Sequence, residues 1–144
     1  MSGQSEFQVG EMLKADYGQR EHGWIEVLGG GKYRIANVPI SDRLNMNDVV
    51  TCTSVNGYLV VDEVLSSEFP NKTLVYYDTR EQYRALWEAS SASGNKTEGM
   101  IAPYVRDGVF NRGLALVNHK DDFDPIKILE DLGVEDPALE ERPL

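Results

Sequence analysis

The sequence predicts an α+β protein in which an N-terminal antiparallel β-meander or small barrel precedes a β-α-β-β-α unit of ferredoxin-like, split βαβ type. Three observations lead to this fold class. A run of three glycines and an Asn-Gly pair, both turn signals, stand between β-rich stretches in the first half. The spacing of apolar residues then becomes helical just after residue 80. A second helical stretch follows an Asp-Pro pair at residues 124–125.

The glycine run at residues 29–31 is followed by Lys32, so a phosphate-binding loop has to be considered. Such a loop needs a Ser or Thr after the lysine and then a helix, because the helix N-terminus supplies aligned N–H groups. Here Tyr33 follows the lysine, and the stretch "YRIANVPI" is rich in β-forming residues. We predict that the glycines form a hairpin turn and bind no nucleotide.

A second hairpin is predicted at Asn56-Gly57, because both central residues of the tightest hairpin turn need a positive φ. The two hairpins together predict a meander of about four strands over residues 24–65. One face of such a sheet is apolar, so it has to curl into a barrel or pack on other elements. We assign residues 1–66 to this β-rich lobe.

Part of this lobe resembles a bacterial family catalogued as domain of unknown function 4265. The resemblance covers about residues 23–65 and rests on Trp24, the stretch "GGGKYRIANVPI" and the stretch "LNMNDVV". Beyond Leu65 the sequence departs from the family, with "SSEFPNKT" where members often carry a Ser-Gly-His-type segment. The resemblance implies a β-rich N-terminal lobe and a bacterial or phage origin, and it implies no activity.

The second lobe is assigned to residues 67–133 and contains two predicted helices. "KTLVYYD" predicts a strand, and Asp78 or Thr79 then caps a helix that ends at Gly94. Two further strands, "EGMIAPYV" and "VFNRGLALVN", flank a turn at residues 106–108. Asp124 and the proline after it open the second helix, which ends at Gly133. We expect residues 134–144 to form a flexible acidic tail, because they combine two prolines with no apolar period.

Charge narrows the class of partner. The net charge is −10, and residues 121–144 hold nine acids against two basic residues, which leaves −3 for the first 120. Nucleic acid is disfavoured because phosphate binding needs a basic face. No stretch is apolar enough to span a membrane, and the single cysteine fits a reducing cytoplasm. We expect a cytoplasmic protein, monomeric or a homodimer, that meets neither nucleic acid nor membrane.

Catalytic, cofactor and metal sites are not predicted. His22 and His119 lie far apart, each at the edge of a predicted strand, and are interpreted as surface or loop residues. Cys52 lies within a strand and is interpreted as a small buried side chain rather than a reactive thiolate. The large aromatic residues Trp24, Trp87 and Tyr83 are expected in the core, with an interface role for one of them as the alternative.

The hypothesis that follows is an acidic cytoplasmic binding protein of the immunity or antitoxin kind, which covers a basic site on a partner such as a toxin. The predicted partner-binding residues are acids before, in and after the second helix: Asp121, Asp122, Glu130, Asp131, Glu135 and Asp136. Acids at a helix C-terminus are unfavourable for the helix dipole, so Glu130 and Asp131 suggest a role outside the helix. Two alternatives stay open. The acidic tail only aids solubility, or the chain is a small enzyme or ligand-binding module with a pocket between its lobes.

Overall fold

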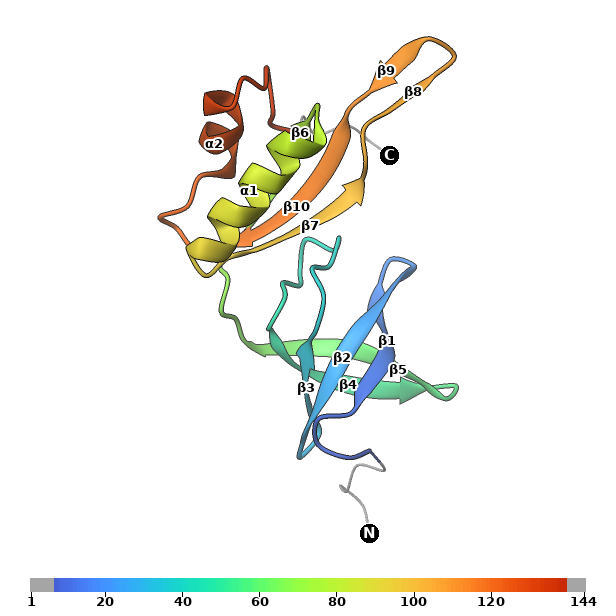
Figure 1. Ribbon diagram of the computed structural model, residues 1–144. Coiled ribbons are helices and arrows are strands. Elements are labelled where there is room, and N and C mark those ends of the chain that lie inside the picture. The colour runs from blue at the N-terminus through green and yellow to red at the C-terminus, as the bar shows by residue number, and fades with distance from the viewer. Residues whose placement is uncertain (1–6, 140–144) are drawn as a thin grey trace. The chain divides into compact units, whose positions relative to one another are not determined.

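The computed structural model describes residues 7–139, and the chain divides into two units, residues 1–70 and 71–144. Both units are rich in strands, and the only two helices among the described residues lie in the second (Figure 1). The mixed α+β class is therefore confirmed. Among the residues that the structure describes, neither helix is long and apolar enough to cross a bilayer.

The first unit is a closed five-stranded barrel with strand order β1-β2-β3-β4-β5. Neighbouring strands pair antiparallel, and the barrel closes through a parallel pairing of β1 with β5, in which Ala15 lies opposite Leu59. The strand bounds are Met12–Gly18, Glu21–Gly29, Lys32–Ile35, Val49–Val55 and Tyr58–Ser66. The sequence prediction of about four strands from residue 24 was one strand short.

The missed strand is β1, and its sequence carried a usable signal. Leu13, Ala15 and Tyr17 alternate with Lys14 and Asp16, and this period-two pattern matches the inward and outward sides of the strand. The turn after it was also hard to see, because its central residues are not glycine. Gln19 and Arg20 have φ of 49° and 64°, values that side chains rarely adopt.

Both predicted hairpins of the barrel are confirmed. Strands β2 and β3 pair antiparallel around Gly30-Gly31, and β4 pairs with β5 around Asn56-Gly57. The turn residues Asn56 and Gly57 have φ of 51° and 83°, as the tight hairpin turn requires. Lys32 begins β3 rather than a helix, so the glycines have no phosphate-binding geometry.

The barrel core is filled from alternate positions of every strand. Its largest fully buried side chains are Tyr17, Ile25, Ile35 and Leu44. Gly23 makes room for the Tyr17 ring, because a Cβ there would lie 2.1 Å from the nearest ring carbon. The residues between these buried positions, including Trp24, face outward from the barrel.

The second unit contains a three-stranded sheet of order β6-β10-β7, in which β10 pairs antiparallel with both neighbours. The element bounds are β6 Asn71–Tyr77, α1 Arg80–Ala92, β7 Lys96–Ile101, β10 Gly113–His119 and α2 Pro125–Asp131. Leu86 of α1 and Leu129 of α2 share one apolar core with Val75 and Val117 of the sheet. Figure 1 shows both helices on the same side of this sheet.

Both helices begin as the sequence predicts. Thr79 is the N-cap of α1 and forms a capping box with Gln82, whose side chain accepts from the Thr79 backbone N–H. Asp124 caps α2, and its side chain accepts a hydrogen bond from the Lys127 backbone. Each helix is followed by a glycine with positive φ, Gly94 or Gly133.

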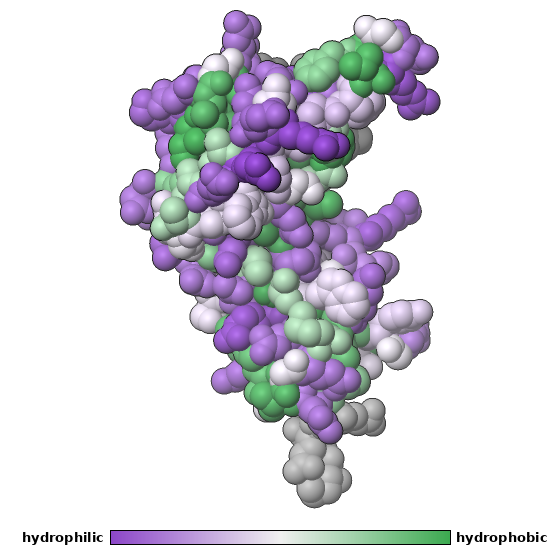
Figure 2. Space-filling view, viewed as in Figure 1, coloured by the Kyte–Doolittle hydropathy of each residue, from purple (hydrophilic) through white to green (hydrophobic). Residues whose placement is uncertain are grey.

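A short hairpin extends from the sheet between β7 and β10. Its strands β8 (Tyr104–Arg106) and β9 (Val109–Asn111) form a separate two-stranded sheet around Asp107-Gly108. The two longer strands predicted on either side of this turn are thus each divided in two. Figure 2 shows hydrophobic side chains on this hairpin, where Val105 and Val109 are 70% and 61% exposed.

The prediction of a flexible tail from residue 134 was wrong for residues 134–139. Val134 is buried at 3% exposure, and the Tyr76 N–H donates to the Pro137 carbonyl at 2.7 Å. Ala138 forms an isolated antiparallel bridge with Val75 of β6. Residues 134–139 therefore line the free edge of β6, satisfying backbone groups that would otherwise be exposed. The rest of the expected tail, and residues 1–6 at the other end, lie outside the described residues.

Candidate functional site

The six predicted partner-binding acids fall at the two ends of α2. Asp121 and Asp122 precede the helix, whereas Glu130 and Asp131 end it and Glu135 and Asp136 follow it. All six are exposed. Seven helical residues span about 10 Å, so the structure separates the acids into two groups. Residues 130–136 contain four of them and run from the last two residues of α2 into the loop after it; we call them the post-helix acidic segment.

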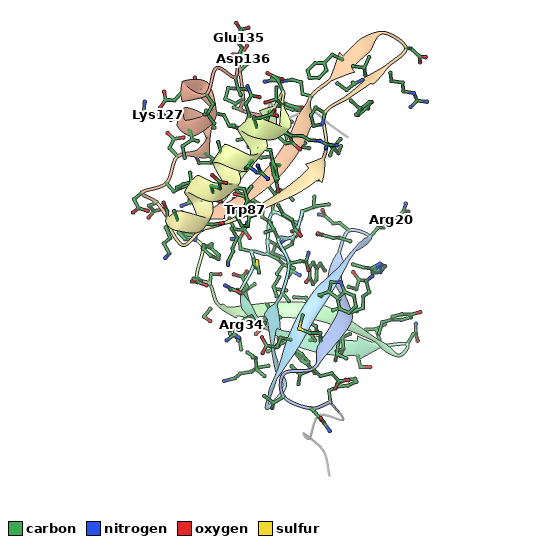
Figure 3. The ribbon with its side chains drawn as sticks, in the orientation of Figure 1. Arg20, Arg34, Trp87, Lys127, Glu135 and Asp136 are labelled. Carbon is green, nitrogen blue, oxygen red and sulfur yellow. The ribbon has the colours of Figure 1, made fainter. Side chains whose placement is uncertain are left out.

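The two groups also differ in their partners. Asp121 accepts a hydrogen bond of 2.7 Å from the side-chain amide of Asn71, so it is engaged within the second unit. Asp131 lies 3.7 Å from the Lys127 ammonium, in an exposed pair one helical turn apart. Among residues 7–139, Glu130, Glu135 and Asp136 have no ion-pair partner. Figure 3 shows Glu135 and Asp136 together, beyond the end of α2.

Arg112 holds the backbone at the end of the post-helix acidic segment, at residues 135 and 136. Its Nη1 donates to the Asp136 carbonyl at 3.0 Å, and its Nη2 donates to the Glu135 carbonyl at 2.8 Å. The Nε–H of the guanidinium donates to the Asp78 carboxylate at 2.8 Å. The guanidinium also lies 5.2 Å from the centre of the Tyr76 ring. One side chain thus ties the acidic segment to β6 and to the loop before α1.

Sequence reasoning missed Arg112. It stands between β9 and β10 and lies more than 20 residues from Glu135 and Asp136, so no local spacing points to the contact. The consequence for the site is direct. Because the carbonyls are fixed by Arg112, the carboxylates of Glu135 and Asp136 project from ordered backbone rather than from a loose tail.

The two histidines have different environments. His22 is exposed on β2, as the sequence predicts. His119 is buried at 7% exposure, so its assignment to the surface was wrong. Its Nε2 lies 2.7 Å from the Thr73 hydroxyl, and its Nδ1 lies 2.8 Å from the Lys120 carbonyl. Both ring nitrogens form hydrogen bonds within the second unit, which indicates a structural role.

Cys52 is half-buried on β4 and has the character of an unreactive thiol. Burial, reinforced by the charge of Asp62, raises the pKa of the Cys52 thiol to about 11. A thiol with this pKa carries almost no thiolate at neutral pH. Within residues 7–139 no three His, Cys, Asp or Glu side chains gather closely enough to hold a metal ion.

The two tryptophans are half-exposed, at 46% for Trp24 and 48% for Trp87, so the prediction that they lie in the core was wrong. Trp24 projects from the barrel, and the Lys14 ammonium lies 5.1 Å from its ring centre. Trp87 projects from α1, two turns after its first residue. An exposed tryptophan is costly in water and is a common anchor of binding sites.

Trp87 lies in an open groove on the second unit, which we call the aromatic groove. It has a volume of about 620 Å³. Its walls come from the end of β6, from α1 and from the segment between β7 and β8. The lining residues are Tyr77, Arg80, Glu81, Tyr83, Arg84, Trp87, Ala102 and Pro103.

A second hollow lies on the barrel, where β1 and β5 meet. It has a volume of about 540 Å³ and is lined by Lys14, Asp16, His22 and Tyr58, among others. Asp16 is partly buried, whereas Lys14 is exposed and Tyr58 is 71% exposed. The mixed charges of this hollow do not select one class of ligand.

Comparison with known proteins adds one structural likeness. No family model matches the chain, and none of the curated proteins matches it. A solved structure described as a novel crystal structure of a hypothetical protein from Neisseria gonorrhoeae is similar, at 14% identity and a TM-score of 0.47. The alignment covers 88% of this chain and 86% of that chain.

Proposed function

We propose that the chain is an acidic cytoplasmic binding protein of the immunity or antitoxin kind, which covers a basic site on a partner protein such as a toxin. The observation that carries the proposal is the post-helix acidic segment. Three of its carboxylates, those of Glu130, Glu135 and Asp136, are exposed and have no ion-pair partner among residues 7–139. Two of them stand on backbone that Arg112 holds.

The hydrogen bonds from Arg112 to the backbone of residues 135 and 136 support a role in binding. A loose acidic tail loses conformational entropy when a partner orders it, and this loss weakens the complex. Residues 135 and 136 are already ordered by Arg112, so binding does not incur that loss again. A net charge of −10 in addition attracts a basic partner over long range and accelerates the encounter.

The test reverses the charge of the post-helix acidic segment, with Glu130, Asp131, Glu135 and Asp136 all changed to Lys. The partner is first captured from a lysate of the source organism with the wild-type chain and identified, and its association rate is then measured at several ionic strengths. We expect the variant to associate about tenfold or more slowly at low salt, with a smaller difference at high salt.

A matched variant separates the segment from the overall charge. Changing the exposed acids Asp42, Asp62, Glu63 and Glu88 to Lys alters the net charge by the same amount. We expect this variant to associate much faster than the segment variant. Equal rates for the two variants would reduce the proposal to a general effect of net charge.

For the second unit we infer a ferredoxin-like arrangement in which β8 and β9 are an inserted hairpin. The order β6-β10-β7, with β10 antiparallel to both neighbours, supports this inference. Further support comes from Ala138, whose antiparallel bridge to Val75 occupies the place of the last strand, beside β6. The inferred arrangement would make the acidic segment the connection from α2 to that strand.

For the first unit we propose membership of the family known as domain of unknown function 4265, on the residue pattern between about residues 23 and 65. The hydrogen bonds of Asn37 give the pattern a structural meaning. Its side-chain oxygen accepts from the Trp24 backbone N–H at 2.9 Å, and it lies 2.7 Å from the Tyr17 hydroxyl. Asn37 of the Asn-x-Pro segment thus links the tryptophan strand to β1, which gives these residues a structural role in the barrel.

A further inference from the structure

The aromatic groove contains two arginines from successive turns of α1. Arg80 and Arg84 are exposed on α1, one turn apart, and neither has an ion-pair partner among residues 7–139. Like charges at this spacing repel each other. Arg80 in addition places a cation in the first turn, where the helix dipole favours an anion. Both side chains line the groove.

The floor of the groove is aromatic. The rings of Tyr77 and Tyr83 have centres 5.1 Å apart and are tilted by 35°. The Tyr77 hydroxyl donates to the Ile101 carbonyl at 3.0 Å, which fixes the ring against the end of β7. Burial raises the pKa of both tyrosines, so neither presents a phenolate to the groove at neutral pH. The exposed Trp87 ring stands beside them.

These residues define the chemistry of a ligand. A guanidinium recognises a phosphate or carboxylate through paired hydrogen bonds, and an exposed indole offers a face on which a planar ring stacks. Glu81 also lines the groove, and its carboxylate can accept a hydrogen bond from a ring N–H of a ligand. Together the three charged residues have a net charge of +1. The volume of about 620 Å³ is that of a site for a small molecule.

We propose that the aromatic groove binds a small organic anion that carries a planar ring, with Arg80 and Arg84 holding the anionic group and Trp87 stacking on the ring. This site is distinct from the post-helix acidic segment, which has the opposite charge. The two proposals rest on different residues, so either can fail without the other.

The test follows the indole N–H resonance of Trp87 by NMR during titration of the full chain. The sequence has two tryptophans, so a Trp24→Phe variant assigns the resonances. The probes are AMP and 2-naphthoate, which carry a ring with a phosphate or a carboxylate, and adenosine and inorganic phosphate, which carry one half each. We expect at least one ring anion to shift Trp87 and to bind about tenfold more tightly than adenosine or phosphate.

Two double variants supply the control. Arg80→Gln with Arg84→Gln is expected to weaken the ring anion about tenfold or more. Arg20→Gln with Arg34→Gln changes the net charge equally on the other unit (Figure 3) and is expected to leave the affinity unchanged. The amide spectrum of each variant reports whether the fold is kept. A Trp87→Leu variant, followed through the amide resonances of α1, tests the stacking contact separately.

Binding of AMP alone would identify the anion as a phosphate, and binding of 2-naphthoate alone would identify it as a carboxylate. The proposal is overturned if neither shifts Trp87 at about 10 mM. It is equally overturned if adenosine binds as tightly as AMP while 2-naphthoate does not bind, or if the Arg80/Arg84 variant binds as the wild type does.

Discussion

Arg112 and Asp136 are joined by a hydrogen bond of 3.0 Å from the guanidinium Nη1 to the backbone carbonyl. The same guanidinium forms an ion pair of 2.8 Å with Asp78, where both side chains are about one-third exposed or less. These contacts connect three segments that are distant in sequence. They convert an acidic stretch without regular structure into an ordered edge of the second unit.

The first prediction is that Arg112→Ala destabilises the second unit and releases residues 134–139. Loss of charged hydrogen bonds at a partly exposed site costs about 2 kcal/mol. Hydrogen exchange measures the local effect, because the Tyr76 N–H donates to Pro137 and the Leu139 N–H donates to Leu74. Both amides are expected to exchange faster in the variant.

Arg34→Ala is the matched control for Arg112→Ala. Arg34 forms a single ion pair with Glu26 at 3.2 Å, in which the side chains are 41% and 33% exposed. An exposed pair of this kind contributes about 0–1 kcal/mol. Equal losses of stability for the two variants would show that the contacts of Arg112 do not anchor the acidic segment.

The second prediction concerns Gly23 on the inner face of the barrel. Gly23→Ala is expected to lower the free energy of unfolding by about 1–3 kcal/mol, because the new methyl group overlaps the Tyr17 ring. Gly99→Ala is the control, since a Cβ there would lie 3.4 Å from the Tyr83 ring, an ordinary contact. Denaturant unfolding of both variants measures the difference.

A double variant shows whether the Tyr17 ring is the obstacle. Gly23→Ala is expected to cost less in a Tyr17→Leu background than in the wild type, with a coupling of about 1 kcal/mol or more. Strictly additive losses would mean that the alanine disturbs something other than the ring.

The third prediction separates the two histidines. His119→Gln is expected to cost about 1–3 kcal/mol, because it disturbs buried hydrogen bonds to Thr73 and Lys120. His22→Gln changes an exposed side chain and is expected to alter stability by less than about 0.5 kcal/mol. Thermal unfolding at neutral pH distinguishes the two. A loss at His22 as large as that at His119 would contradict this assignment.

The fourth prediction concerns the pH dependence of Cys52. With its pKa raised from 9.0 to about 11, the folded thiol is expected to react with iodoacetamide about a hundredfold more slowly at pH 8 than the unfolded thiol. The folded rate should rise with pH up to about 11. A rate that levels off near pH 9 would show an unperturbed thiol.

The same shift predicts a change in stability at alkaline pH. Between pH 9 and 11 the unfolded thiol loses its proton while the folded thiol keeps it, so the stabilising contribution is complete below pH 9 and is lost as the pH rises. A Cys52→Ala variant has no thiol and therefore lacks this pH-dependent contribution to the unfolding free energy. Its unfolding free energy is expected to fall less steeply over this pH range than that of the wild type.

Turns and helix starts are the parts of this protein that the sequence by itself determined. Three such features are the Asn56-Gly57 hairpin, the Thr79 capping box and the cap at Asp124. Each of them depends only on residues that lie within four positions of one another in the sequence. The dihedral preferences and side-chain contacts that form them are complete within those few residues. Local sequence was therefore sufficient for them, and with them for the α+β class.

Exposure of the tryptophans was decided by the tertiary structure. Trp24 follows Gly23 and precedes Ile25, and β-strand alternation sends neighbouring side chains to opposite faces. Because the Ile25 side chain points into the barrel core, the neighbouring Trp24 projects outward despite its size. The alternation of β2 was visible in the sequence and pointed Trp24 outward. The prediction of burial instead followed the size and apolar character of the indole, and it was wrong.

Tertiary structure alone also decided the partners of Arg112, the burial of His119 and the order of residues 134–139. Arg112 donates hydrogen bonds to Asp78, which precedes it by 34 residues, and to Asp136, which follows it by 24 residues. Ala138 bridges to Val75 on an edge that exists only once the sheet has formed. Such contacts depend on which distant segments the fold brings together, and this cannot be predicted from residue type or local spacing. The sequence indicated acidic residues after a helix, and the folded chain determined that an arginine would hold them in place.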